Sequence, residues 1–106
     1  MKEDSMQPEK DIVTVVARQT YKEPVAGASL AAIETLIAAS RAEAGCVEYS
    51  AHINPDDPCQ VLFYERWRDQ QAFETHIATA HFERFVGSQA ESFAIPGELG
   101  FWRRLA

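Results

Sequence analysis

The sequence predicts an α+β domain with a ferredoxin-like βαββαβ order, formed by residues 11–106. Strand-like segments with β-branched or alternating apolar residues occur at residues 11–21, 46–53, 61–67 and 99–105. Segments with apolar residues at helical spacing follow Ser29 and Asp69. The resulting order is the split βαβ arrangement, in which two helical segments cover one face of an antiparallel sheet.

The first strand and first helix are expected within residues 11–45. Residues 11–21 (DIVTVVARQTY) carry apolar side chains at both odd and even positions, which predicts a strand buried on both faces. Ser29 is expected as the N-cap of the helix, and Gly45 as a left-handed residue that ends it. The helix should bury an apolar stripe: Leu30, Ile33, Leu36, Ile37 and Ala44.

A hairpin is expected to follow, because residues 46–53 alternate in polarity and residues 54–58 (NPDDP) have turn chemistry. Its predicted register pairs Ile53 with Val61, Ala51 with Phe63, Tyr49 with Glu65, and Val47 with Trp67. The same register places Glu48 opposite Arg66 on the reverse face, as a favourable ion pair. Tyr49, Glu65 and Trp67 should therefore share one face of the sheet.

The second helical segment is expected to begin at an Asp69 N-cap and to break near residues 79–81. Its inner stripe is Ala72, Phe73, His76, Ile77 and Ala80. The next apolar set is out of phase with that stripe: Phe82, Phe85, Val86 and Phe93. The change of phase predicts a kink or two short helices.

Composition excludes several classes of function. A net charge of −6 argues against a nucleic-acid partner, and no apolar run is long enough to span a membrane. Residues 1–10 are polar and are expected to form a flexible extension rather than a signal peptide. Cys46 and Cys59 should lie at opposite ends of the hairpin as free thiols, which indicates a cytoplasmic location.

The strands carry apolar residues on both faces, whereas the helices can cover only one. The uncovered face is therefore expected to pack against a second copy, giving a homodimer closed sheet to sheet.

The histidines lack the spacing of known metal motifs. His76 and His81 would point about 140° apart on an unbroken helix, so a metal site would need convergence through the tertiary fold and none is expected. His76 is either a histidine hydrogen-bonded in the core or a general base, since imidazole titrates near neutral pH. Trp67 is either core packing or a surface on which a planar ligand stacks. Glu65 is either paired structurally or an acid in a pocket.

Three short stretches carry a family resemblance. Residues 43–46 (EAGC) with Tyr49, residues 63–67 (FYERW), and the AF…H…HF pattern of residues 72–82 resemble the antibiotic biosynthesis monooxygenase domain family. The likeness covers about residues 11–105 and is strongest to small bacterial members likened to quinol monooxygenases.

The resemblance implies a dimeric α+β barrel with a pocket between the sheet and helices of each subunit. It also implies oxidation of a quinol- or polycyclic-phenol-like molecule by dioxygen, without a cofactor. The expected catalytic residues are His76, Trp67 and Glu65. The expected substrate-binding residues are Tyr49, Phe73, His81, Phe82 and Phe85.

Three alternatives remain open. Haem-degrading members of the family pair the Trp and His with an asparagine on the first strand, where this chain reads Ala17-Arg18-Gln19. Other members isomerise phosphorylated autoinducer sugars, for which Arg18 or the Arg103–Arg104 pair would have to hold the phosphate. The third alternative is a non-catalytic dimer that binds small aromatic molecules.

Overall fold

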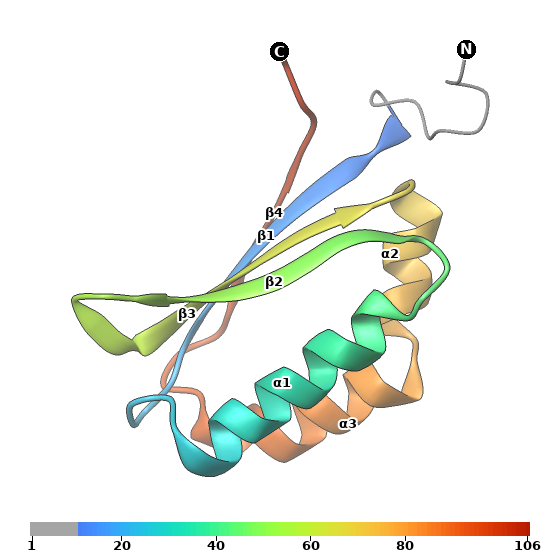
Figure 1. Cartoon of the computed structure of the whole chain (residues 1–106). Helices are drawn as coiled ribbons and strands as arrows, with labels where there is room; N and C mark the ends of the chain where they lie inside the picture. Colours follow the sequence, from blue (N-terminus) through green and yellow to red (C-terminus); the bar gives the residue numbers. More distant parts are fainter. Residues whose placement is uncertain (1–10) are drawn as a thin grey trace.

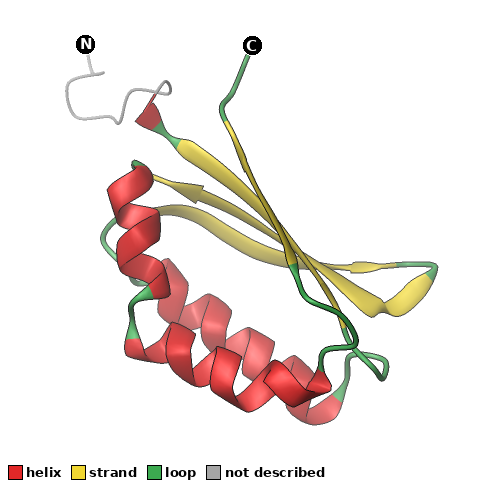
Figure 2. Ribbon diagram, turned by 180° about the vertical axis from the view of Figure 1, so that it is seen from behind, coloured by secondary structure: helices red, strands yellow, loops and turns green. Residues whose placement is uncertain are grey.

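Residues 11–106 are described by a computed structural model as two layers, a four-stranded antiparallel sheet and a layer of helices on one of its faces (Figures 1 and 2). The elements are β1 (Val13–Thr20), α1 (Gly27–Arg41), β2 (Cys46–Asn54), β3 (Asp57–Trp67), α2 (Gln70–Ile77), α3 (Ala80–Gln89), the 3₁₀ turn η3 (Ala90–Ser92) and β4 (Glu98–Trp102). The strand order β2-β3-β1-β4 confirms the ferredoxin-like fold. The extension predicted for residues 1–10 lies outside the described residues.

The hairpin register is confirmed over most of its length. Ile53 pairs with Val61, Ala51 with Phe63, and Tyr49 with Glu65. Glu48 also lies opposite Arg66, with 3.7 Å between carboxylate oxygen and guanidinium nitrogen. The sequence therefore predicted correctly which face of β2 and β3 carries Tyr49 and Glu65.

The predicted pair Val47–Trp67 is wrong, since Trp67 pairs with Cys46. A bulge between Cys46 and Glu48 shifts the register there, and Val47 is 45% exposed. A bulge leaves one residue unpaired and is invisible in an alternating pattern. The turn is also shorter than expected, because β3 already begins at Asp57.

Helix α1 begins and ends differently from the prediction. Its N-cap is Ala26; the Ser29 hydroxyl donates to the Ala26 carbonyl at 2.9 Å and accepts from the Ala26 N–H at 3.1 Å. Gly45 is not left-handed, and within residues 11–106 the only positive φ belongs to Gly27. Ile33 and Leu36 are buried as predicted, but Leu30 is 44% exposed and Ala44 is also exposed.

The break in the second helical segment is confirmed. The Asp69 side chain accepts from the Ala72 N–H at 2.9 Å and caps α2, which ends at Ile77. Thr79 caps α3 by accepting from the Phe82 N–H at 3.2 Å. The closing strand, β4, spans Glu98–Trp102 and is shorter than the predicted 99–105. Its last residue, Trp102, pairs with Thr14, and β1 extends only one residue beyond Thr14, to Val13.

The core lies between the sheet and the helices, around Val15, Leu36, Phe63, Trp67 and Phe73. The two free cysteines, Cys46 and Cys59, lie far apart along the hairpin, as expected. Helices α1 and α3 run side by side under the sheet (Figure 1).

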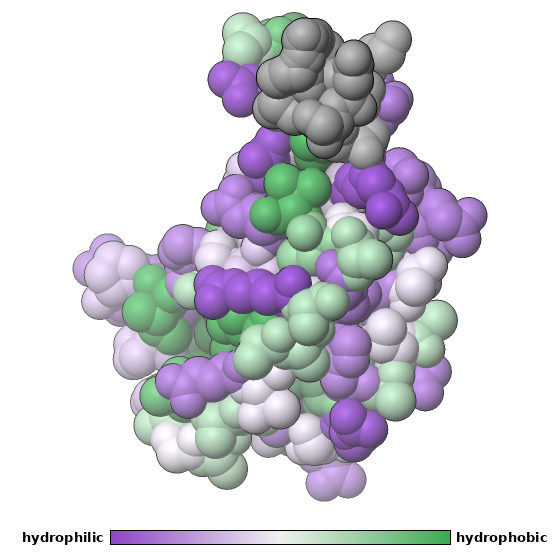
Figure 3. All heavy atoms as spheres, turned by 45° about the vertical axis from the view of Figure 1, so that its right-hand side comes forward, coloured by the Kyte–Doolittle hydropathy of each residue, from purple (hydrophilic) through white to green (hydrophobic). Residues whose placement is uncertain are grey.

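The outer surface is mixed in polarity. Figure 3 shows hydrophilic side chains over much of one face, with hydrophobic side chains in separate patches. Within residues 11–106 no helix has the length and apolar character needed to cross a membrane.

Candidate functional site

A cavity of about 450 Å³ lies between the sheet and all three helices. Its wall is mostly apolar and includes Leu36 of α1, Phe63 of β3 and Val86 of α3. Six of the eight residues expected in a pocket line it: Tyr49, Glu65, Phe73, His76, Phe82 and Phe85. Residues from four separate elements therefore meet where the sequence predicted a pocket.

Trp67 does not line this cavity. Its side chain is fully buried behind the wall, and its ring centroid lies 4.6 Å from that of His76, at 34° between the ring planes. The indole Nε1–H donates to Glu65 Oε1 at 2.8 Å. A ligand in the cavity would therefore not stack on Trp67, which instead supports His76 and Glu65 from behind.

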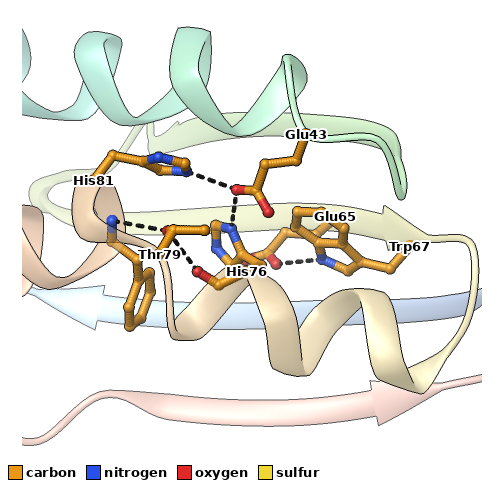
Figure 4. A network of polar contacts seen from close by, with 7 residues as sticks. Glu43, Glu65, Trp67, His76, Thr79 and His81 are labelled. Atoms are coloured by element: carbon orange, nitrogen blue, oxygen red, sulfur yellow. Dashed lines mark hydrogen bonds and ion pairs between the residues drawn. The ribbon is translucent and has the colours of Figure 1, made fainter.

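His81 does not line the cavity either. It borders a different hollow, on the far side of the α1–α3 contact, together with Thr35 and Arg84. Its ring is turned toward Glu43 in the loop after α1, as Figure 4 shows. The expected substrate contact is thus replaced by a contact to a carboxylate.

Glu43 connects the two histidines. Its Oε2 lies 2.7 Å from His76 Nδ1 and 2.7 Å from His81 Nε2, so both rings approach the same oxygen (Figure 4). The Glu43 side chain is 12% exposed, that of His81 21%, and that of His76 1%. The three side chains form a row from the protein interior toward the surface.

The contact with Glu43 fixes the tautomer of His76. An ionised carboxylate can only accept hydrogen bonds, so His76 Nδ1 carries the hydrogen. Burial lowers the pKa of His76 below its usual range, although the hydrogen bond and charge of Glu43 oppose the change. His76 is therefore neutral near pH 7, and its Nε2 holds a lone pair with no hydrogen-bond partner among residues 11–106.

Glu65 has an unusual protonation equilibrium. Burial raises its pKa to about 7; the Trp67 hydrogen bond lowers it, and the charge of Glu43 raises it further. Its residue is only 4% exposed, on an otherwise apolar stretch of wall. Near neutral pH Glu65 can therefore serve as a hydrogen-bond donor or as an acceptor.

Tyr49 adds a second weak acid to the wall. The side chain is buried, its ring centroid lies 5.4 Å from that of His76, and burial raises the pKa of its phenol above the usual range. Tyr49 consequently keeps its proton at neutral pH, and its hydroxyl interacts with Ser40 of α1.

The helix break brings His81 near His76. Thr79 stands between α2 and α3, donating its hydroxyl to the His76 carbonyl at 2.7 Å. A continuous helix would hold the two histidines on different faces, about 140° apart. The change of direction instead puts their ring centroids 6.2 Å apart.

The loop that carries Glu43 packs directly on α2. A Cβ atom placed on Gly45 would lie 2.4 Å from Ala72 Cβ, closer than atoms can approach. The Arg68 N–H also donates to the Gly45 carbonyl at 2.8 Å. Close packing at Gly45 therefore sets the distance between Glu43 and His76.

Glu43 was not among the residues predicted to form the site. It belongs to the EAGC stretch that carries the family resemblance, but an acid in a helix-terminal loop is common and matches no motif. Only the position of Gly45 against α2 brings it to His76. The one available signal was that an expected core histidine needs a hydrogen-bond partner.

The arginines considered for a phosphate do not form a cluster in the cavity. Arg18 borders it but is ion-paired with Glu98. Arg103 and Arg104 line a separate hollow with Thr14 and Tyr64. Another hollow, of about 390 Å³, is lined by Arg18, His52 and Gln60 and contains neither Glu65 nor His76.

The fold agrees with comparisons to known proteins. Residues 12–88 match the family model described as antibiotic biosynthesis monooxygenase. The chain belongs to this family. The family resemblance stated from the sequence is therefore confirmed.

Three proteins illustrate the family and fold relationships. An uncharacterised Synechocystis protein, sll1783, is 32% identical over 74 residues, which cover 70% of this chain and only half of that protein's length. The crystal structure of PA3566 from Pseudomonas aeruginosa is 33% identical with a TM-score of 0.82, covering 93% of this chain and 99% of that one. SnoaB from Streptomyces nogalater, a cofactor-independent oxygenase, is 21% identical with a TM-score of 0.72, covering 89% and 93%, and shares the fold.

Proposed function

We propose that this protein is a cofactor-independent monooxygenase that oxidises a quinol- or polycyclic-phenol-like molecule with dioxygen. The observation that carries the proposal is the hydrogen bond between His76 Nδ1 and Glu43 on the wall of an apolar cavity. Burial lowers the pKa of His76 and so favours its neutral form. The family supports oxygen chemistry, and SnoaB shows that one protein of this fold is described as a cofactor-independent oxygenase.

The reaction would begin with proton transfer. A phenolic or enolic O–H in the cavity gives its proton to His76 Nε2, and the resulting anion is electron-rich. One electron then passes from this anion to dioxygen, and the two radicals join in a new carbon–oxygen bond to give a peroxide anion. This anion takes the proton back from His76 and becomes a hydroperoxide. The O–O bond then breaks with loss of the hydrogen on the same carbon, so one oxygen atom stays as a carbonyl and the other leaves as water.

The remaining groups would stabilise charge and exclude water. Glu43 accepts from His76 Nδ1 and favours the imidazolium that forms during proton transfer. Glu65 in its protonated form is a donor for negative charge on oxygen. Trp67 is a positioning residue, because it contacts Glu65 and His76 but not the cavity.

The test is oxygen consumption by chelator-treated protein with a panel of hydroquinones and anthrones. We expect turnover by the wild type and a loss of about 10²–10⁴-fold in His76→Ala, the usual contribution of a general base. The matched control is His52→Ala, because His52 is exposed on β2 and hydrogen-bonds only Ser50 among the contacts described. Wild-type consumption no faster than buffer across the panel would reject the proposal.

Two further measurements separate the alternatives. A non-catalytic binder would show ligand-dependent thermal stabilisation without product. An isomerase would turn over a phosphorylated sugar without oxygen. The cavity fits this substrate poorly, because Arg18, the one arginine that borders it within residues 11–106, is paired with Glu98. The two free cysteines favour a reducing compartment, so we place the protein in the cytoplasm.

We also propose that two copies pack through the helix-free face of the sheet. In one copy this face leaves Val16, Leu62 and Tyr64 half-buried and Trp102 63% exposed. Burying them would account for the apolar character of both faces of β1 and β3. Light scattering at micromolar concentration should give a dimer mass, and Leu62→Glu should give a monomer. A monomeric wild type would contradict the proposed dimer.

A further inference from the structure

Glu43, His76 and His81 combine three metal-binding side chains from separate elements. Glu43 comes from the loop after α1, His76 from the last turn of α2, and His81 from the first turn of α3. The carboxylate oxygen and the two ring nitrogens lie within 4.8 Å of one another. In Figure 4 both rings are directed at the carboxylate rather than past it.

The composition of the cluster fits a defined class of ion. Two imidazoles and one carboxylate are a recurring donor set for zinc, with bonds of about 2.0–2.2 Å and a fourth position left open. Ligand atoms around such an ion are about 3.4 Å apart in tetrahedral geometry. Glu43 Oε2 would therefore move less than about 1 Å away from each nitrogen, from its present separation of 2.7 Å. The two nitrogens, now within 4.8 Å of each other, would settle at the same ligand–ligand separation of about 3.4 Å.

The burial of the three ligands also suits an ion. His76 is enclosed, whereas Glu43 and His81 keep 12% and 21% of their side-chain surface exposed. An ion can enter from the His81 side, and water can occupy the open position there. The close packing of Gly45 against Ala72 keeps the Glu43 loop near α2, so the site is largely preorganised.

We propose that Glu43 Oε2, His76 Nδ1 and His81 Nε2 form a binding site for one divalent transition-metal ion of the zinc class. Coordination through Nδ1 requires the hydrogen of the neutral His76 ring to sit on Nε2. An occupied site therefore changes Nε2 from an acceptor into a donor and removes the lone pair proposed as the general base. The loss of the general base rests on the proposed function, whereas binding of the ion does not.

Binding is tested with the chelator-treated, full-length protein and Co²⁺ as a spectroscopic probe. We expect visible d–d absorption of a four- or five-coordinate ion, saturation at one Co²⁺ per chain, and displacement by Zn²⁺. His81→Ala and Glu43→Gln should each weaken Co²⁺ binding at least tenfold. His52→Ala is the matched control and should bind as tightly as the wild type, because His52 lies on β2 outside the cluster.

The folding of each variant is checked by circular dichroism and by its melting temperature in chelator. Zn²⁺ should then raise the melting temperature of the wild type and of His52→Ala, but not that of His81→Ala. Equal Co²⁺ binding by the wild type and folded His81→Ala would overturn the site, as would the absence of d–d bands in the wild type. Because none of these readouts requires turnover, a failed oxygen assay would leave the metal site standing and the reverse also holds.

Discussion

The two sides of His76 differ in their partners and in their access to water. On the outer side, the partly exposed Glu43 accepts from both histidines. On the inner side, Glu65 is 4% exposed and receives a single N–H from Trp67. The two carboxylates therefore have different roles: Glu43 fixes the His76 tautomer, and burial raises the pKa of Glu65, on the same cavity wall, to about 7.

The largest expected effect is on the pH dependence of the unfolding free energy and comes from Glu65, on the inner side. Folding raises its pKa from 4.5 to about 7, so the folded state binds this proton more tightly than the unfolded state. The free energy of unfolding should therefore fall as pH rises from about 4.5 to 7 and level off above that. Since one pKa unit corresponds to about 1.4 kcal/mol, the total change is on the order of 3 kcal/mol.

Glu65→Gln should remove this pH dependence, because an amide does not titrate and its oxygen can still accept from Trp67. Denaturant titrations of both proteins from pH 4.5 to 8 measure the difference. Parallel pH profiles for the wild type and Glu65→Gln would show that Glu65 is ionised throughout that range.

The second largest effect concerns the packing of the Glu43 loop on α2. Gly45→Ala places a methyl group 2.4 Å from Ala72 Cβ and should cost about 1–3 kcal/mol of unfolding free energy. Gly87→Ala is the control, because its new methyl group meets nothing within 4 Å and it lies inside α3. It should stabilise the protein by about 0.5–1 kcal/mol. Equal effects of the two substitutions would contradict the close packing at Gly45.

A smaller effect, on the rate of oxygen consumption, is expected when the Glu43 side chain loses its charge. Glu43→Gln keeps the shape of the side chain but can no longer favour an imidazolium at His76. We expect a decrease of about tenfold or more in oxygen consumption, with the melting temperature nearly unchanged. Unchanged consumption would show that Glu43 does not support the base.

The smallest effect is a shift in one titration. Trp67→Phe removes the indole N–H that favours the charged form of Glu65, so the pKa of Glu65 should rise further. Carbon-detected NMR of the labelled carboxyl group measures this shift. A lower pKa in Trp67→Phe would contradict the assigned contact.

Periodicity was enough to predict the elements and most of the hairpin register, whereas the cavity was expected from the family resemblance. The alternation of β2 and β3 placed Tyr49 beside Glu65, and the change of phase after Ile77 located the helix break. These are local patterns, which adjacent residues determine. The bulge at Cys46–Glu48 and the early start of β3 at Asp57 depend on pairing between strands and were missed.

The missing parts of the site are non-local contacts. Glu43 meets residues 33 and 38 positions away, across three elements. His81 was expected in the pocket because it is near His76 in sequence, but the turn at Thr79 directs it to Glu43. No pattern within one element reports such a contact, so both assignments required the three-dimensional structure.

The arrangement of His76 can be measured directly by long-range ¹H–¹⁵N correlation NMR of chelator-treated, histidine-labelled protein at pH 7. The account predicts a neutral ring with hydrogen on Nδ1 and an unprotonated Nε2, and loss of that signature in Glu43→Ala. A ring protonated on Nε2, or a fully charged imidazolium at pH 7, would contradict it.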